Sequence, residues 1–415
     1  MFERLFKYPR VLARHQEGPA AEARQRFLNH CSDQGMARAT LLRNAREVLV
    51  IADRIDVAAG RTITRQEIEG AADRWAIDQH KRRRVQEPRW SRALFIQTAT
   101  SWLRFLQVLE RPEIKPSPFA DQIADFAAYM EHERGLSPVT IHNQCWHVEK
   151  FLQWLQEQNR AFGDVSLVDV DSFLAAKGQK GWTRVSVAGS AKALRAFFRH
   201  AGQRGWCAAS IATGIDGPRF FQNEGLPVGP DWEDVQRLIG SANGDQPRNI
   251  RDKAILMLFA IYGFRRGEVA RLRLDDVNWE HEVISVARPK QRRAQPYPLV
   301  RGVGEALLRY LREVRPRCAH REIFLTLKAP FRPLSPSGLY HVVSSRLSQF
   351  DIRIPRRGPH SLRHACAGHL VAEGFSLKEI GDHLGHRSAY ATRIYAKVDV
   401  AGLREVANVD LGGLL

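Results

Sequence analysis

The sequence predicts a mainly α-helical chain with a small β-sheet, an α+β fold, over 415 residues. Apolar residues recur at helical spacing through most of the chain, whereas short strand-like runs are confined to residues 283–300. A hydrophobic content of 44% is sufficient to build cores, and the length favours two to four domains over one.

Two segments rich in proline and glycine, residues 111–118 and 213–230, predict linkers between these domains. They leave three expected domains. The first is a helical module at 1–112, the second is another helical module at 118–210, and the third is a mixed domain with a C-terminal tail at 226–415.

The first two segments share a pattern that indicates a duplicated helical module. The alternative is that two unrelated amphipathic hairpins align equally well, because periodic apolar patterns are degenerate. The matching pairs are Phe27 and Phe126, residues 35–41 and 135–141, Trp90 and Trp182, and residues 103–106 and 194–198.

Several elements can be placed in the third domain. Residues 254–264 predict a buried helix, and residues 283–286 and 297–300 predict two short strands around a basic turn. Ser376 and Glu379 form an S-x-x-E capping box, which predicts the start of a late helix.

The net charge of +18 gives the chain a positive field at physiological pH. Nucleic acid is the first partner that such a field predicts, and an anionic membrane surface is the second. The longest strongly apolar run, residues 254–264, is shorter than the about 18 residues that a membrane span requires, and no signal-peptide core is visible. We therefore expect a soluble protein of the bacterial cytoplasm that associates with the nucleoid.

The five cysteines lie far apart and include no CxxC pair, which argues against a disulfide framework and against a zinc knuckle. We interpret all of them as reduced thiols in the core. They are Cys31, Cys145, Cys207, Cys318 and Cys366.

Arg265 lies where the buried run ends, within Gly-Phe-Arg-Arg-Gly-Glu. An arginine at such a helix end is preorganised to bind a phosphate, and Glu268 is placed to hold its guanidinium group. Considered alone, the motif favours the alternative of an ordinary helix-terminal cation paired with Glu268.

Lys290 lies on the basic turn between the two predicted strands. A lysine on such a turn can enter a DNA groove and donate a proton, or it can merely contact phosphates. Considered alone, this motif favours a solvated turn.

His360 and Arg363 are three residues apart in His-Ser-Leu-Arg-His, so on a helix they share one face. His360 and His364 also have the spacing of zinc proteases. Position 361 is serine rather than glutamate, however, and Arg363 repels a dication, so we disfavour a zinc site. His364 is interpreted as a core histidine.

His386 ends a Leu-Gly-His motif, and Tyr395 follows nine positions later. A tyrosine flanked by Ile394 and Ala396 is more typical of a half-buried packing residue than of a nucleophile. Its significance depends on the candidate residues that precede it.

Taken together and in this order, the motifs resemble the tyrosine recombinases, the phage-integrase family of site-specific DNA recombinases. The similarity covers residues 226–400, and residues 119–206 are similar to that family's core-binding domain. The resemblance implies helical core-binding domains, SAM-like in the second module, followed by a tyrosine-recombinase catalytic domain.

The resemblance also implies roles for the candidate residues. Tyr395 attacks the scissile phosphate, forms a 3′-phosphotyrosyl bond and leaves a free 5′-hydroxyl. Arg265 and Arg363 bind the non-bridging oxygens, and Lys290 is the general acid for the departing 5′-oxygen.

His360 then assists proton transfer, and His386 hydrogen-bonds the phosphate. General chemistry supports this division, because a tyrosine with a pKa of about 10 is a poor nucleophile without nearby cations and a base. Two guanidinium groups stabilise the charge that gathers on the equatorial oxygens. The covalent link conserves the energy of the phosphodiester, so we expect no metal, no ATP and no other cofactor.

The sequence departs from the family pattern at two places. Phe264 replaces a commoner leucine, and Arg266 with Gly267 replaces an apolar-small pair. Pro289 and Gln291 stand where glycines usually flank the lysine, so a neighbouring arginine of the turn is an alternative to Lys290 near the leaving oxygen.

Double-stranded DNA with specific recombination sites is the predicted partner. We expect a homotetramer on two duplexes, with accessory recombinases or DNA-bending proteins. A C-terminal tail with Leu403, Val406 and Val409 at helical spacing is expected to dock on a neighbouring protomer, and residues 1–112 are expected to add a DNA-binding or protein-contacting module. The predicted DNA contacts are Arg266, Arg292, Arg293, Lys81, Arg82, Arg83 and Arg84.

The predicted function is strand exchange that integrates or excises a mobile element, as in transposition. One alternative is an enzyme similar to type IB topoisomerases, which relaxes supercoils. Another is a DNA-binding accessory protein that has lost catalysis. The two core-binding-like modules and the H-x-L-R-H motif favour the recombinase, and the retention of all six polar residues argues against an inactive protein.

Overall fold

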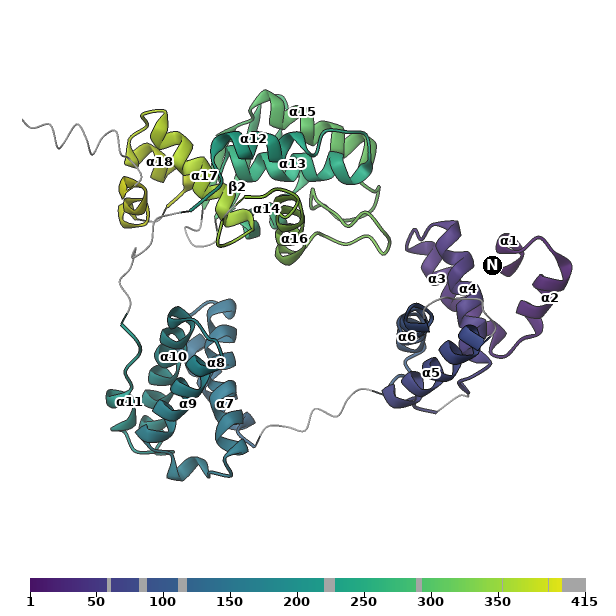
Figure 1. Ribbon diagram of the computed structural model, residues 1–415, viewed down its shortest axis with the longest axis horizontal. Coiled ribbons are helices and arrows are strands. Elements are labelled where there is room, and N and C mark those ends of the chain that lie inside the picture. Colours follow the sequence, from purple (N-terminus) through teal and green to yellow (C-terminus); the bar gives the residue numbers. More distant parts are fainter. Residues whose placement is uncertain are drawn as a thin grey trace, which may run out of the picture. The chain divides into compact units, whose positions relative to one another are not determined.

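The computed structural model describes residues 1–57, 61–81, 88–110, 118–219, 228–288, 293–352, 354–386 and 388–397. Its many helices and small sheet confirm the predicted α+β class (Figure 1). The chain forms two compact units, residues 112–225 and a discontinuous unit made of residues 1–111 and 226–415. None of the described helices is long and apolar enough to cross a membrane.

The N-terminal residues fold around a core of their own. Phe27, Val48, Phe95 and Trp102 are buried in it. Their helical spacing within each segment predicts these amphipathic helices. The helices are α1 (Phe2–Leu5), α2 (Pro9–Glu17), α3 (Ala21–Asp33), α4 (Arg38–Ala52), α5 (Arg65–Lys81) and α6 (Pro88–Phe105).

Residues 118–219 form a second helical module, which is a unit by itself. Its core is rich in aromatic rings, and Phe151 packs edge-on against Phe173 and Phe198 at centroid distances of 5.4 and 5.6 Å. Such edge-to-face pairs add to the stabilisation by burial. The helices are α7 (Ala120–His132), α8 (Pro138–Glu157), η1 (Phe162–Asp164), α9 (Leu167–Gln179), α10 (Arg184–Gln203) and α11 (Ile211–Gly214).

Helix α13 (Pro247–Ile261) is central to the C-terminal part of the chain, since it contacts most of the other helices there. It is the predicted buried helix, but it begins earlier than residue 254 and ends before residue 264. The end is set by Gly263, whose φ of +59° lies in the left-handed region. The helices around it are α12 (Trp232–Gly240), α14 (Arg266–Arg271), α15 (Arg301–Arg309), α16 (Pro336–Leu347) and α17 (Pro359–Ala372).

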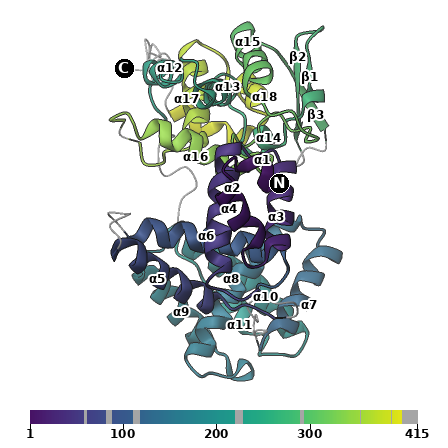
Figure 2. The same ribbon diagram turned by 90° about the vertical axis from the view of Figure 1, so that its right-hand side faces the viewer.

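The sheet has three antiparallel strands in the order β1, β2, β3, and they lie side by side (Figure 2). The central pair confirms the predicted hairpin, with Ile284 opposite Tyr297 in the register. The second strand was predicted too late in the chain, at 297–300, because residues 293–296 carry no strand-like apolar pattern, yet their backbone pairs with 285–288. The first strand was not predicted, because two residues are too few to show an alternating pattern. The strands are β1 (Val277–Asn278), β2 (Val283–Arg288) and β3 (Arg293–Pro298).

Helix α18 (Leu377–Leu384) begins at the predicted capping box. The Glu379 carboxylate accepts a hydrogen bond from the Ser376 amide at 2.8 Å, and the Ser376 hydroxyl accepts one from the Glu379 amide at 3.3 Å. The predicted tail helix lies outside the described residues. The remaining short helices are η2 (Leu274–Asp276), η3 (Tyr310–Val314), η4 (Ala389–Ala391) and η5 (Arg393–Lys397).

The cysteines are all free thiols, as predicted, but their placement in the core is wrong for two of them. Cys318 is exposed and Cys207 is half-buried, whereas the other three are buried. Cys318 follows η3 in a connecting segment, where the sequence offers no apolar periodicity to bury it.

Candidate active site

Arg265 occupies the N-cap position of α14, directly after the turn at Gly263. The buried Glu268 carboxylate accepts hydrogen bonds from the Arg265 amide at 2.7 Å and from its Nη1 at 2.8 Å. The guanidinium group is therefore fixed on one side, while 45% of the side chain is exposed. This combination suits an arginine that binds an anion arriving from solvent.

Arg363, on α17, is almost completely buried. Its Nη1 donates to the carbonyl oxygen of Gly263, and its Nη2 donates to that of Leu384 at 2.8 Å. Burial, followed by the nearby charge of Arg265, lowers the pKa of Arg363 to about 10. The group is still cationic at neutral pH, so the protein holds a positive charge away from water.

Three guanidinium groups meet at the C-terminus of α18. Arg265 Nη2 donates to the Gly385 carbonyl at 3.0 Å, and Arg288 Nη1 donates to the Leu384 carbonyl at 2.7 Å, where Arg363 also binds. The last carbonyls of a helix lack intrahelical partners and carry the negative end of its dipole. The helix end thus orients the cations that would otherwise repel one another.

Gly385 explains why the Leu-Gly-His motif has glycine at its centre. Its φ is +61°, and a Cβ there would lie 1.2 Å from Arg288 Nη1. A side chain at this position is therefore excluded by the guanidinium group as well as strained by the backbone.

Arg288 and Tyr297 belong to this cluster, although the sequence motifs did not single them out. Arg288 donates to the Tyr297 hydroxyl, which in turn donates to the His383 carbonyl at 2.6 Å. Burial raises the pKa of Tyr297 to about 12, so the hydroxyl remains a donor. Strand alternation is a signal that was available, because Ile284, Val286 and Arg288 all lie on the buried face of β2.

The histidines of the cluster are neutral at physiological pH. His386 is bonded through Nδ1 to the Thr392 hydroxyl at 2.7 Å, and burial, then Arg363, lowers its pKa to about 4. The pKa of His360 is also lowered, by packing around its ring and then by Arg363, although the residue is exposed. A neutral imidazole has one donor and one acceptor nitrogen, so each can relay a proton.

Tyr395 is only 2% exposed, and it lies against two of these histidines, His364 and His386. Its hydroxyl is 3.0 Å from Nδ1 of His364, and its ring is parallel to that of His386 at 6.4 Å. Burial raises the pKa of Tyr395 to about 12. His364, interpreted from the sequence as a core histidine, is half-buried, and its side chain contacts the candidate nucleophile.

A hollow of about 460 Å³ lies beside Arg265, Arg363 and His360. Five arginines line it, and the described residues that line it include no carboxylate. Such a surface attracts an anion of phosphate size. The lining residues are Phe264, Arg265, Arg266, Tyr340, Pro355, Arg356, Arg357, Gly358, Pro359, His360, Ser361 and Arg363.

Several predicted residues cannot be placed. Lys290, Arg292 and residues 82–84 lie outside the described part of the chain. Arg293 begins β3 and Lys81 ends α5, and for both only the backbone is described. Within the described ranges, no three His, Cys, Asp or Glu side chains form a group able to hold a metal ion.

Comparison with known sequences agrees with this geometry. Residues 231–401 match the phage integrase family, and residues 123–205 match the phage integrase N-terminal SAM-like domain. Over 404 residues the chain is 32% identical to the integrase/recombinase y4rA of Sinorhizobium fredii, with 96% of each protein covered. The chain belongs to the phage integrase family of tyrosine recombinases.

Other relatives are consistent with this membership. The tyrosine recombinase XerD of Listeria monocytogenes is 28% identical over 291 residues, which cover 69% of this chain and 97% of XerD. This family membership confirms the predicted class of enzyme, one that breaks and rejoins DNA strands.

Two solved structures have the same fold as this recombinase. XerH bound to a palindromic difH substrate in a post-cleavage complex has a TM-score of 0.55 at 19% identity, over 74% of this chain and 93% of that one. A lambda integrase dimer bound to a core site has a TM-score of 0.52 at 17% identity, over 66% and 94%.

Proposed function

We propose that this recombinase cleaves DNA at specific sites through Tyr395. The hollow lined by five arginines carries the proposal, because it borders two preorganised guanidinium groups and His360. The His360 ring packs against His364, which is hydrogen-bonded to the buried phenol. In this scheme Arg265 and Arg363 bind the non-bridging oxygens of the scissile phosphate. Their remaining N–H groups stabilise the charge that grows on those oxygens in the transition state.

The roles of His386 and His360 follow from the same geometry. The bond from His386 Nδ1 to Thr392 fixes the ring, so that Nε2 is the nitrogen that binds the phosphate. His360 lines the hollow and assists proton transfer. Lys290 is assigned as the acid for the 5′-oxygen, on the family resemblance alone. The arginines supply the charge stabilisation that a metal would otherwise provide, so the scheme uses neither metal nor ATP.

Tyr395 must become accessible before it can attack, because it is 2% exposed. We propose that binding of the duplex at the hollow brings the phosphate to the phenol, with a small displacement of η5 that keeps Tyr395 in contact with His364. The short helix is a single turn with few contacts, so a small rearrangement is enough.

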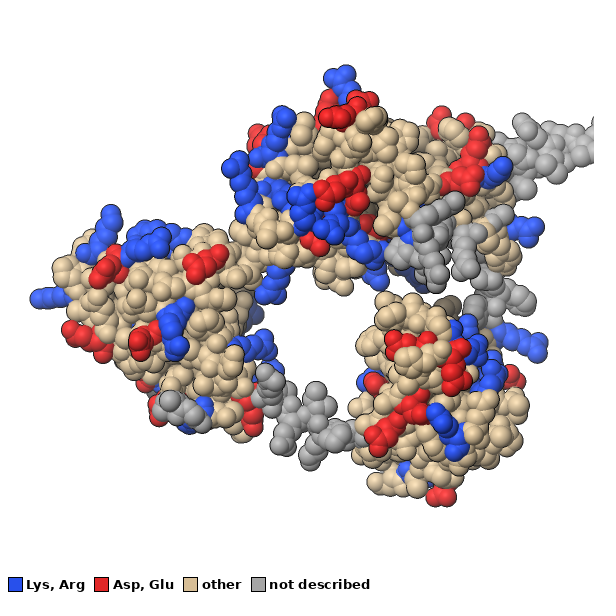
Figure 3. Space-filling view, turned by 180° about the vertical axis from the view of Figure 1, so that it is seen from behind, with Lys and Arg blue, Asp and Glu red and all other residues tan. Residues whose placement is uncertain are grey.

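Double-stranded DNA is the proposed substrate, and integration or excision of a mobile element is the proposed biological role. XerH and lambda integrase were solved on DNA, and a Tn1549 transposon integrase bound to a circular intermediate has a TM-score of 0.51. Lys and Arg side chains are present on all the described parts of the chain rather than on one of them (Figure 3). A homotetramer on two duplexes, docked through the C-terminal tail, is the proposed assembly.

The test uses a duplex that carries the recombination site and a nick next to the scissile phosphate. The short 5′-hydroxyl fragment between the scissile phosphate and the nick diffuses away after cleavage, so the strand cannot be rejoined and a covalent protein–DNA adduct accumulates. We expect the adduct with the natural chain and none with Tyr395→Phe. Relaxation of supercoiled DNA without any site would favour the topoisomerase alternative, and the lack of an adduct on a tightly bound site would favour the inactive accessory protein.

We also propose that residues 1–111 are a second copy of the module at 118–219. In each, a glycine with positive φ ends the turn between the first two long helices, Gly35 (+79°) and Gly135 (+57°). The next helix then begins in the same way, with the Thr40 and Thr140 amides bonded to the carbonyls three residues earlier at 2.9 and 2.8 Å.

The third helix of each module starts at the same kind of cap. The Thr64 amide donates to the Glu67 carboxylate at 2.9 Å before α5, and the Ser166 amide donates to the Asp169 carboxylate at 2.8 Å before α9. Each carboxylate also pairs with an arginine of the preceding loop. Two unrelated hairpins have no reason to share these details.

The fourth helices end alike, which supports one register between the two proposed copies. Gln107 and Gly205 both have positive φ, and the following amides bond to Leu103 and Ala201. This register pairs Leu103 with Ala201, whereas the sequence match paired it with Leu194. Apolar positions seven residues apart are equivalent in a helical pattern, which explains why the sequence match is shifted by seven residues.

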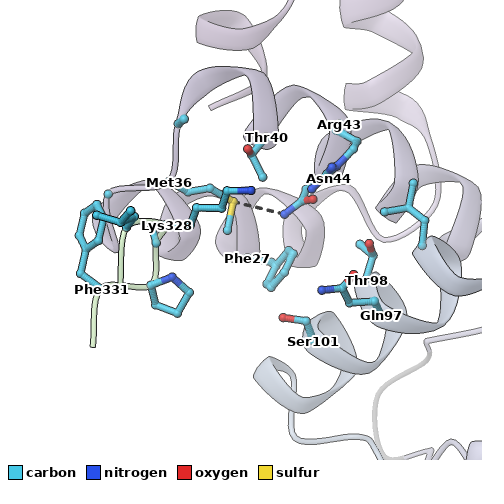
Figure 4. A pocket seen from close by; sticks show the side chains of 16 residues that line it. Phe27, Met36, Thr40, Arg43, Asn44, Gln97, Thr98, Ser101, Lys328 and Phe331 are labelled. Atoms are coloured by element: carbon cyan, nitrogen blue, oxygen red, sulfur yellow. Dashed lines mark hydrogen bonds between the residues drawn. The ribbon is translucent and has the colours of Figure 1, made fainter. Parts of the chain in front are cut away.

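A hollow occurs at the same place in both modules but differs in charge. In the second module it is lined by Arg134, Lys192, Arg195 and Arg199. In the first, the helix α6 presents Leu94, Gln97 and Ser101 at the positions of the last three. Thr40, Arg43 and Asn44 of α4 and Lys328 also line this hollow (Figure 4). We propose that the α10 face of the second module binds phosphates here, while the α6 face of the first contacts flanking DNA through the uncharged groups of Gln97 and Ser101.

Deletion of residues 1–110 tests this second proposal. We expect weaker binding to a duplex that extends beyond the core site and little change on the core site alone. Unchanged binding and recombination on the extended site would contradict it.

A further inference from the structure

His364 is the side chain that holds the candidate nucleophile. Its Nδ1 lies 3.0 Å from the Tyr395 hydroxyl, and the two rings are 5.8 Å apart. We propose that His364 accepts the proton of Tyr395 during strand cleavage and returns it during rejoining. This inference rests on the proposed assignment of Tyr395 as the nucleophile.

The position of His364 separates it from the other histidines. His386 is bonded through Nδ1 to Thr392 and meets the phenol only as a parallel ring at 6.4 Å. His360 packs edge-on against His364 at 4.3 Å and lies at the hollow instead. Within the described part of the chain, the histidine that is hydrogen-bonded to this phenol is His364.

His364 also has the protonation state that the role requires. Burial, followed by electrostatic repulsion from His360 and then from Arg363, lowers the pKa of His364 to about 4. The ring is therefore neutral at physiological pH and has one unprotonated nitrogen. In the tautomer that leaves Nδ1 unprotonated, this nitrogen accepts the phenolic hydrogen.

The step balances as a transesterification. The Tyr395 oxygen forms a bond to phosphorus while its proton passes to His364 Nδ1. The bond from phosphorus to the 5′-oxygen breaks, and the 5′-oxygen takes a proton from the acid of the site. Rejoining reverses each movement: the 5′-hydroxyl attacks, and His364 returns its proton to the phenolic oxygen.

Bound DNA makes this transfer favourable. A buried phenol does not ionise on its own, because its pKa is raised to about 12. The anionic phosphate, bound between Arg265 and Arg363, offsets the positive charges that oppose protonation of His364. The imidazolium can then form as the bond to phosphorus forms, which is the condition for general base catalysis.

The experiment compares the full-length natural chain with His364→Ala and His364→Asn in single-turnover cleavage of the nicked duplex. His369→Ala is the matched control, because this histidine lies on the same helix and pairs with Glu373 at 3.8 Å instead of the phenol. We expect each His364 variant to lose about 10²-fold in cleavage rate, with DNA affinity and melting temperature close to those of the control.

Two readouts define the role of His364: the first distinguishes proton transfer from packing, and the second distinguishes the base from the acid. Added imidazole should restore cleavage by His364→Ala in proportion to its concentration. A duplex with a 5′-bridging sulfur, whose thiolate leaves without an acid, should not rescue either variant.

Cleavage by His364→Ala within about threefold of the natural rate would overturn the inference, and so would full rescue by the sulfur substrate. Retention of the adduct by Tyr395→Phe would instead overturn the nucleophile assignment, so the two failures are distinguishable.

Discussion

Arg288 and Arg363 donate hydrogen bonds to one and the same atom, the carbonyl oxygen of Leu384, at 2.7 and 2.8 Å. One arginine ends a strand and the other lies on a helix, so the C-terminus of α18 connects the sheet to helix α17. Arg363 contacts the hollow, whereas Arg288 acts through the shared carbonyl.

Replacing Arg288 by methionine should therefore affect both stability and cleavage. We expect the free energy of unfolding to fall by at least about 2 kcal/mol, because buried acceptors lose a charged donor. Cleavage of the nicked duplex should slow by about 10²-fold as Arg363 and Gly385 shift. Urea unfolding and single-turnover assays measure these effects. Arg266→Met, an exposed substitution on α14, is the control for stability. An equal loss of unfolding free energy in the two variants would contradict the role of the shared carbonyl.

Alanine substitutions at two glycines with positive φ distinguish the cost of backbone strain from the cost of the close approach of Arg288. Gly374 (φ +84°) would have no atom within 4 Å of an added Cβ, whereas at Gly385 the Cβ would overlap Arg288. Gly374→Ala should cost about 1 kcal/mol of unfolding free energy from strain alone. Gly385→Ala should cost at least about 2 kcal/mol more and abolish cleavage. Similar costs in urea unfolding would show that the guanidinium group is not where the structure places it.

Lowering the pH should destabilise the catalytic domain. The pKa values of His364 and His386 are lowered to about 4 from an ordinary value near 6.5. Between these values the unfolded chain binds more protons than the folded one, so the unfolding free energy falls as pH drops from 6.5 towards 4 and is insensitive to these groups above 6.5. Urea unfolding at pH 7 and pH 5 should show a smaller fall for a His364→Asn, His386→Asn double variant. An identical fall would contradict the burial of these rings.

The two hollows predict different salt dependences of DNA binding. Lys192→Ala combined with Arg199→Ala should reduce the slope of log affinity against log salt by about 2, since each cation releases about one counterion. The matched pair in the first module, Gln97→Ala with Ser101→Ala, should weaken binding to an extended duplex without changing the slope. Titrations at several salt concentrations measure both, and equal slopes for both double variants would contradict the assignment of phosphate contacts to the second module.

Local patterns explain what the sequence predicts well. The spacing of His360 and Arg363 on α17, the Arg265–Glu268 pair and the Ser376 capping box all join residues within one helical turn, so a helical pattern is enough to place them. The occurrence of these motifs together, in the last third of the chain, then indicates the family.

The contacts that complete the site join residues that are far apart in the sequence. Helical or strand spacing cannot predict such contacts. The bond from Arg288 to Leu384 spans 96 residues, and the bond from His364 to Tyr395 spans 31. The acceptor at Leu384 is a backbone carbonyl, a group that every residue carries, so its sequence gives no sign of the role. Arg288 was detectable in part, because strand alternation puts it on the buried face.

The central claim is that Tyr395 forms the covalent bond to DNA, and Tyr390 is its natural control. Tyr390 is 49% exposed and lies one short helix earlier, so it is the more accessible phenol in the free protein. Mass spectrometry of the adduct peptide identifies the modified tyrosine directly. We expect a nucleotide on Tyr395, unaffected by Tyr390→Phe and lost in Tyr395→Phe. An adduct on Tyr390, or one that persists in Tyr395→Phe, would contradict the claim.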